Sequence, residues 1–120
     1  MSSEYHEPFE SLSENARDIH RALVSVIEEL QAVDWYHQRA EGATDPELKE
    51  IVLHNRDEEL EHAAMALEWL RRRMPPLDEH LRTYLFTGGN ILEVEEAQAE
   101  GSKAAASGSD LGIGSGKEGA

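Results

Sequence analysis

Glu59 and His62 lie three residues apart in the stretch 55–62, which reads NRDEELEH. On a helix this spacing places a carboxylate and an imidazole on the same face, one turn from each other. A Glu-x-x-His pair that faces inward is half of the ligand set of a ferritin-like di-iron site. Because an acid-rich chain with six histidines produces such a spacing by chance, the pair must also face a core and have further ligands nearby.

The helix that carries this pair has clear boundaries in the sequence. The Thr44 hydroxyl can accept a hydrogen bond from an amide of the first turn, and the Glu47 side chain can accept one from the Thr44 amide in return. Pro46 suits a first-turn position. We expect the helix to run to about Arg73 and to stop before Pro75 and the proline that follows.

A 4–3 spacing along this helix defines a stripe with apolar or small ends and a polar middle. Its members are Leu48, Val52, Asn55, Glu59, His62, Ala66 and Trp69. A carboxylate on such a stripe is costly to bury unless it is paired or binds a metal. The stripe therefore favours a metal site. The alternatives are a hydrogen-bonded core histidine at His62 and a boundary carboxylate at Glu59 that reaches water.

The preceding helix supplies the partner stripe. Ser11 and Glu14 form a capping-box pattern, so we expect this helix to start between Pro8 and Ser13 and to end near Ala40. The 4–3 spacing of its apolar residues is typical of a long helix that packs at a shallow angle on another. These residues are Ile19, Leu23, Val26, Leu30 and Val33.

The short connection between the two helices predicts an antiparallel hairpin. Glu29 and Glu59 each lie about 15 residues from its turn, so they should lie opposite each other. Glu28 points about 100° further round, either as a solvated residue or as an outer ligand. Tyr36 lies two helical turns from Glu29. Its side chain is either a phenol beside the metal ligands or an aromatic ring at the core boundary whose hydroxyl contacts water.

One hairpin provides only one Glu and one Glu-x-x-His, and a di-iron carboxylate site needs two of each. Two copies related by a two-fold axis supply the full set. The same pairing covers apolar surface that about 85 ordered residues without cysteine cannot enclose alone. We therefore predict an all-α, ferritin-like antiparallel two-helix hairpin with a short third helix, completed to a four-helix bundle by homodimerisation.

The ligand types also indicate the metal. Carboxylates with one imidazole per metal suit iron or manganese better than thiolate-bound metals, and the chain has no cysteine. We expect two irons per dimer interface and oxidation of Fe(II) by dioxygen. His62 must be neutral to act as a ligand.

For the remaining segments the sequence predicts shorter helices and flexible ends. Residues 1–10 are predicted to be a flexible N-terminus and 11–100 a helical domain, in which 77–86 form the third helix and 91–99 a last helical piece. From about Gly101 the chain is rich in Gly, Ser and Ala, which predicts a disordered linker over 101–120.

The charge balance narrows the function classes. Twenty-five acidic residues face eleven Lys plus Arg, for a net charge of −14. Such a surface repels nucleic acids and anionic membranes and concentrates cations, including other divalent ions at outer acidic sites. With no membrane-length apolar run and no signal-peptide pattern, we expect a cytoplasmic protein that binds neither nucleic acid nor membrane.

Three segments together resemble the encapsulated ferritin family of bacteria. They are EELQAVDWY at 28–36, HNRDEELEHAAM at 54–65 and HLRTYLF at 80–86. The resemblance implies a two-helix protomer, a ferroxidase centre shared across a dimer, and a decameric ring of five dimers. Members oxidise iron, and an encapsulin shell encloses the mineral.

The resemblance also assigns individual residues. By position, Glu29, Glu59 and His62 match the ferroxidase ligands, and Tyr36 matches the nearby tyrosine. Glu28 and Trp35 match an outer region through which metal reaches the site. This chain has Gln31 where the family often has a further carboxylate in that region.

The tail is similar to an encapsulin-targeting peptide of the form Leu-x-Ile-Gly-Ser-Leu. Leu111, Ile113, Gly114 and Ser115 fit the pattern, and Gly116 stands where a second large apolar residue is usual. Residues Leu111–Ser115 are thus expected to dock on an encapsulin shell protein, and the alternative is a disordered tail with no partner.

The leading hypothesis is a ferroxidase that serves as cargo of an encapsulin nanocompartment in iron storage and detoxification. The alternatives are a non-enzymatic acidic helical oligomerisation module, a rubrerythrin-like di-iron peroxide reductase and a hemerythrin-like binder. A hemerythrin-type site would need more histidines than the stripe offers.

Overall fold

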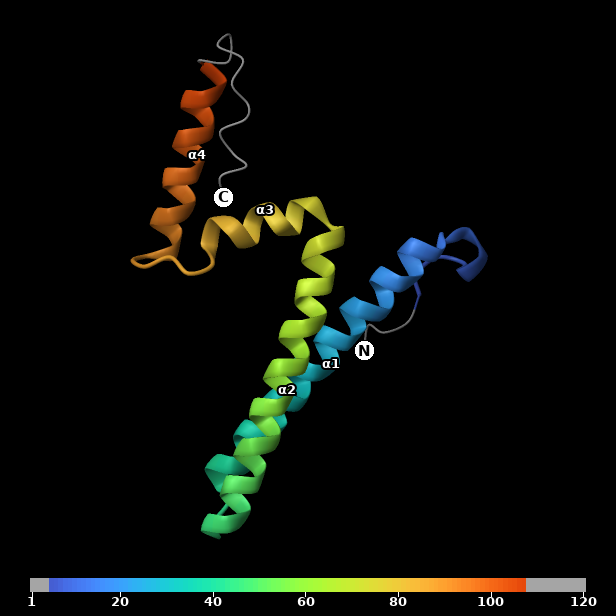
Figure 1. Ribbon diagram of the computed structural model, residues 1–120, viewed down its shortest axis with the longest axis vertical. Coiled ribbons are helices and arrows are strands. Elements are labelled where there is room, and N and C mark those ends of the chain that lie inside the picture. The colour runs from blue at the N-terminus through green and yellow to red at the C-terminus, as the bar shows by residue number, and fades with distance from the viewer. Residues whose placement is uncertain (1–4, 108–120) are drawn as a thin grey trace. The chain divides into compact units, whose positions relative to one another are not determined.

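A computed structural model describes residues 5–107, with side chains as far as Lys103. The described residues form helices and no strand, which confirms the all-α class (Figure 1). The elements are η1 (Phe9–Ser11), α1 (Glu14–Gly42), α2 (Pro46–Arg73), α3 (Pro75–Tyr84) and α4 (Ile91–Ser107). The chain divides into two compact units, one ending at Arg73 and the other beginning at Met74. No described helix has the length and apolar character needed to cross a membrane.

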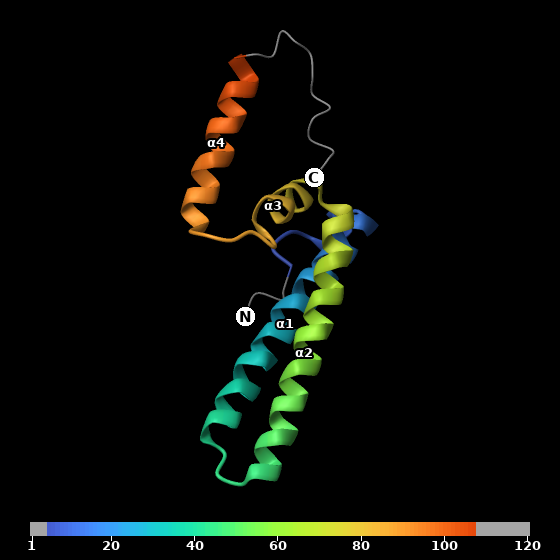
Figure 2. The ribbon, with the colours of Figure 1, turned by 60° about the vertical axis from the view of Figure 1, so that its left-hand side comes forward.

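The first unit is the antiparallel hairpin of α1 and α2 (Figures 1 and 2). The capping residue of α1 is Ser13, whose hydroxyl accepts a hydrogen bond from the Ala16 amide at 3.0 Å, so the capping box expected at Ser11 is wrong. At α2 the Asp45 carboxylate accepts from the Leu48 amide at 2.9 Å, where Thr44 was expected to cap. In both cases the side-chain oxygen closer in sequence to the helix accepts a hydrogen bond from an amide that has no acceptor within the helix.

The hairpin has a small core. Four described residues are buried: Ala40, Val52, Ala63 and Leu70. Several members of the expected stripes are exposed instead, namely Leu23 (43%), Leu30 (48%) and Leu48 (50%). Two helices side by side can cover only one line of contact, so the apolar faces to either side stay open. The hairpin alone thus leaves a large apolar surface uncovered, as the sequence indicated.

The segment before α1 is more ordered than expected for residues 5–10. The Arg17 guanidinium lies 3.7 Å from the centre of the Phe9 ring and donates to the Phe9 carbonyl at 2.6 Å. Tyr5 meets Phe9 edge-on and stacks on His20, with centroids 4.2 Å apart in the second pair. These cation–π and ring contacts hold the segment against the first turns of α1.

The second unit contains α3 and α4. Pro75 and Pro76 form the first turn of α3, where a missing amide proton costs nothing, so this helix starts before the expected residue 77. The chain leaves α3 at Leu85, whose backbone is extended, and the next residue, Phe86, has a φ of 63°. The Asn90 side chain accepts from the amides of Leu92 and Glu93 and so caps α4.

Helix α4 continues to Ser107, beyond the position near Gly101 at which we expected a linker to begin. Alanines are the strongest helix formers, and the run Ala104–Ala106 extends the helix despite Gly101. The expected shell-docking residues Leu111–Ser115, together with Gly116, lie outside the described residues.

Candidate metal centre

The hairpin brings together the three residues expected to bind metal. Glu29 projects from α1, and Glu59 and His62 project from α2, one helical turn apart. The His62 Nδ1 atom lies 3.6 Å from the Glu29 Oε2 atom and 3.6 Å from the Glu59 Oε2 atom. One ligand atom from each residue lies within 4.8 Å of the other two. Within residues 5–107 these three form the one group of three or more His, Cys, Asp and Glu residues placed to hold a metal ion.

The separations fit a divalent first-row metal ion. Nitrogen and oxygen ligands lie about 2.1 Å from such an ion, as they do in zinc sites. Two ligand atoms on one ion are then about 3.0 Å apart when adjacent and about 4.2 Å apart when opposite. The two 3.6 Å separations fall between these values. The Glu29 and Glu59 oxygens, which are up to 4.8 Å apart, need only small side-chain rotations to do so. The donor set, two hard carboxylates and one imidazole, suits iron or manganese.

The centre is only half covered by its own chain. The side chains of Glu29 and Glu59 retain 27% and 24% of their exposure, and His62 retains 43%. Three donors also leave an octahedral metal with open positions. The three residues correspond to half of the ligand set of a ferritin-like di-iron centre, which draws a Glu from two helices and a Glu-x-x-His from two more.

The other residues assigned from the sequence lie outside this group. Tyr36 is half-buried on α1 with the Arg39 guanidinium 5.3 Å from its ring centre. Glu28 is exposed, and Trp35, one heptad further on, is 49% exposed. Trp35 lines a shallow open pocket of about 280 Å³ together with Gln38 and Arg39.

A contact between the two helices lies on the side of the centre that is closer to the α1–α2 turn. The Arg56 guanidinium of α2 lies 3.1 Å from the Nδ1 atom of His37 on α1 and donates to its neighbour Asp57 at 2.9 Å and 3.1 Å. Arg56 is one turn from Glu59, so this link holds α2 against α1 where the two carboxylates converge.

Comparison with known proteins identifies the family. The model of the EncFtn-like family matches residues 4–88. A curated relative from Rhodospirillum rubrum, described as an encapsulated ferritin-like protein, is 60% identical over 100 residues, which are 83% of this chain and 71% of that protein. The chain belongs to the EncFtn-like family. This confirms the family to which the three sequence segments were similar.

Other relatives agree with this assignment. A ferritin-like protein from Thermotoga maritima is 55% identical over 113 residues, covering 94% of this chain and 97% of that protein. A crystal structure of a protein from Nitrosomonas europaea is 56% identical to this chain, with a TM-score of 0.71 over 72% of this chain and 96% of that one.

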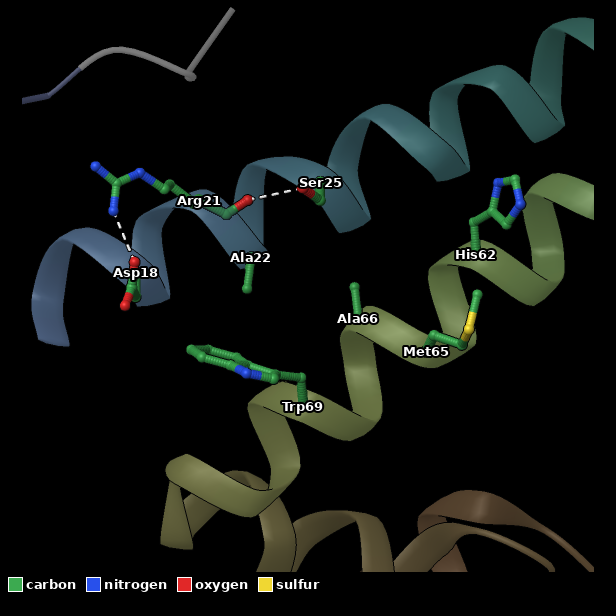
Figure 3. Close-up of a pocket in the computed structure, with 8 residues that line it drawn as sticks. All are labelled: Asp18, Arg21, Ala22, Ser25, His62, Met65, Ala66 and Trp69. Carbon is green, nitrogen blue, oxygen red and sulfur yellow. Dashed lines mark hydrogen bonds and ion pairs between the residues drawn. The ribbon is translucent and has the colours of Figure 1, made fainter.

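A groove opens beside the candidate metal centre. It has a volume of about 470 Å³ and runs between α1 and α2 from His62 to Trp69 (Figure 3). Its lining is Asp18, Arg21, Ala22, Ser25, His62, Met65, Ala66 and Trp69. Small residues on both helices leave the space open, and the Trp69 indole lies across it toward Ala22. Arg21 is held on the rim by Asp18 at 2.6 Å, and the Ser25 hydroxyl donates to the Arg21 carbonyl.

An ionic cluster lies near the end of α2, away from the candidate metal centre. The Arg71 Nε–H donates to Glu68 at 2.7 Å, and the Arg72 Nε–H donates to it at 2.8 Å. These hydrogen bonds, that of Arg71 first, lower the pKa of Glu68 to about 2. Glu68 therefore binds its two arginines and is not a candidate metal ligand.

Sequence reasoning named the three residues that the hairpin brings together, but it did not predict the groove. Met65 is 59% exposed and lines the groove one turn beyond His62, and we had assigned it no role. The signal was available, because residues three apart on a helix share a face and Met65 follows His62 at that distance.

Proposed function

We propose that this member of the EncFtn-like family is a ferroxidase that oxidises Fe(II) to Fe(III) with dioxygen at a di-iron site shared between two protomers. The observation that carries the proposal is the convergence of Glu29, Glu59 and His62 on one point of the hairpin, with half of a ferritin-like ligand set present. Iron is the substrate here, and the family assignment supports iron as the metal.

The ligands have distinct roles in this proposal. Carboxylates bind both Fe(II) and Fe(III), and their charge offsets the extra positive charge that oxidation creates. Glu29 and Glu59 come from different helices, and each carboxylate could bind one metal ion or bridge two. His62 supplies the neutral nitrogen ligand, so iron binding releases its proton whenever the imidazole is protonated. Two irons held together deliver two electrons to one dioxygen molecule.

The second protomer is part of the same proposal. A two-fold axis beside the half-exposed His62 would bring a second Glu29, Glu59 and His62 to the centre and complete the set. It would also cover apolar side chains that one hairpin leaves open, among them Leu30 and Leu60, which are 48% and 44% exposed. Burial of such surface is the main driving force for association. Assembly of these dimers into a decameric ring follows from the family resemblance.

Two further roles are proposed from the resemblance. Tyr36 would serve as a phenol near the centre. Glu28 and Trp35 would belong to the outer region through which metal arrives. Both of the latter side chains are exposed and one heptad apart on α1, which is consistent with a surface path.

The experiment is anaerobic addition of Fe(II) followed by air, with ferric absorbance recorded over time. His62→Ala and Glu59→Gln should lose most of the oxidation rate. The matched controls are His54→Ala and Glu58→Gln, which make the same chemical changes at exposed positions of the same helix. Site variants that oxidise iron as fast as their controls would refute the site.

Oligomeric mass tests the shared site separately. With an iron-like divalent ion such as Mn(II), the parent protein should form dimers or larger assemblies, and His62→Ala should need more metal to do so. A parent protein that stays monomeric with metal bound would contradict the shared centre, whatever its activity.

We also propose that the protein is the cargo of an encapsulin shell. The name of the Rhodospirillum rubrum relative, an encapsulated ferritin-like protein, supports this partner. The docking segment would be Leu111–Ser115. On co-expression with a shell protein, the full chain should co-purify with the shell and an Ile113→Ser variant should do so less. Equal loading of both chains would exclude this segment.

A further inference from the structure

The groove beside the metal centre contains a thioether whose position is unusual. Met65 is the most exposed large apolar residue of the α1–α2 hairpin, at 59%. It lies on the groove wall next to His62 in sequence register, three residues further along α2. In a helix, residues at this spacing have Cβ atoms about 5–6 Å apart.

The direction of the Met65 side chain brings its sulfur closer still to the centre. Helical side chains lean toward the N-terminus of their helix, which for Met65 is the direction of His62. Figure 3 shows the Met65 side chain extending along α2 toward the turn that carries His62. Met65 and His62 both line this groove.

The proposed reaction produces an oxidant at that point. Two Fe(II) ions give two electrons to dioxygen, and with two protons the product is hydrogen peroxide. A thioether reacts with hydrogen peroxide by attack of sulfur on one oxygen. The O–O bond breaks, an S–O bond forms, and the other oxygen leaves as water, so the methionine is oxidised to its sulfoxide and the peroxide is reduced.

We propose that Met65 is an oxidation site that accepts an oxygen atom from the hydrogen peroxide formed at the Glu29–Glu59–His62 centre. This inference rests on the proposed ferroxidase function. Dedicated reductases convert methionine sulfoxide back to methionine. Met65 thus consumes peroxide in a repairable form, before the peroxide reaches less repairable groups. In the same groove such a group is Trp69, whose indole is also oxidisable. The modification adds one oxygen atom to Met65 and is therefore detectable by mass as a discrete product.

The chain offers an internal control for the experiment. Trypsin cuts after Arg56, Arg71 and Arg73, which places Met65 in the peptide 57–71 and Met74 in the peptide 74–82. Met74 belongs to the second unit and is half-buried. The full-length protein is loaded anaerobically with Fe(II), exposed to air in the presence of catalase, digested and analysed by mass spectrometry. Fragment ions separate oxygen on Met65 from oxygen on Trp69 in the shared peptide.

During iron oxidation the sulfoxide fraction at Met65 should exceed that at Met74 by at least about five-fold, because the oxidant forms about one helical turn away and reacts before catalase can remove it. Glu29→Gln lacks one ligand but keeps the peptide 57–71 unchanged, and in this variant the excess at Met65 should disappear. With added hydrogen peroxide and no iron, the parent and Glu29→Gln should show equal oxidation at Met65. Met65→Leu, similar in volume, should show no sulfoxide in that peptide.

Ferric absorbance from the same samples separates the two proposals. Normal ferric formation with equal sulfoxide at Met65 and Met74, or with an excess at Met65 that catalase abolishes, would overturn the role of Met65 and leave the ferroxidase standing. A parent protein that forms no ferric product would overturn the ferroxidase and this inference with it.

Discussion

Replacement of Glu59 by Gln should stabilise the metal-free protein while it removes iron oxidation. The Glu29 and Glu59 carboxylate oxygens that face His62 are no more than 4.8 Å apart. Without metal, two like charges are held at this distance by the packing of α1 on α2. The substitution removes one charge and keeps the shape of the side chain.

The size of the effect follows from Coulomb's law. Two unit charges 4.8 Å apart repel by about 3.5 kcal/mol at an effective dielectric constant of 20, and by about 0.9 kcal/mol in water. The two side chains keep about a quarter of their exposure, so solvent and salt screen much of the larger value. We expect Glu59→Gln to gain about 1 kcal/mol, which corresponds to a rise in Tm of about 4–8 °C for a domain of this size.

The assay is thermal unfolding by far-UV circular dichroism, with chelator present and at one protein concentration, because association also shifts Tm. The buffer should be near pH 8.5, where histidine is ordinarily neutral and does not offset the carboxylates. Glu58→Gln is the matched control and should change stability by less than about 0.5 kcal/mol, as is usual for an exposed position. With Mn(II) added, the order should reverse, since the parent binds the ion more tightly.

A metal-free Glu59→Gln protein less stable than the parent would refute this reasoning. It would mean that the two carboxylates gain more from their surroundings than they lose by mutual repulsion. A gain of equal size in Glu58→Gln would also refute it, because the effect would then come from the overall charge of −14 rather than from the metal centre.

Two other predictions concern α2. Because the folded-state pKa of Glu68 is lowered to about 2 from 4.5, its ionic cluster contributes stability above about pH 4.5 that is lost as the pH falls toward about 2. The parent should be more stable than Glu68→Gln at neutral pH, the difference should vanish near pH 2, and a pH-independent difference would contradict the ionic cause. Leu70 is 1% exposed, so Leu70→Ala should cost about 2–5 kcal/mol in chemical unfolding. Leu92→Ala, at a position 69% exposed, should cost less than about 0.5 kcal/mol, and equal losses would show that burial at Leu70 does not decide its contribution.

Local patterns in the sequence sufficed for the helices and for most of their ends. Periodic apolar residues and Pro46 gave α1 and α2 within a few residues of their observed bounds, because helix formation depends on neighbours in sequence. The capping residues were less certain. Ser13 and Asp45 cap the helices instead of Ser11 and Thr44, since adjacent Ser, Thr and Asp residues compete for the same free amides.

The ligand set itself was a property of the sequence. The spacing of Glu59 and His62 is fixed by one helix, and the short hairpin connection determines that Glu29 lies across from them. The sequence also showed that one hairpin has too little core, which agrees with only four buried residues among those described. Both results follow from counting residues along helices of known pitch.

The tertiary structure decided what surrounds those ligands. How far α1 and α2 stand apart depends on the side chains at every crossing point, and a stripe pattern does not record it. Only the folded hairpin places the ligand atoms 3.6 Å apart, leaves His62 partly exposed, and opens the groove that joins His62 to Met65 and Trp69. The sequence determined which residues could bind a metal, and the packing of the two helices determined which side chains lie beside them.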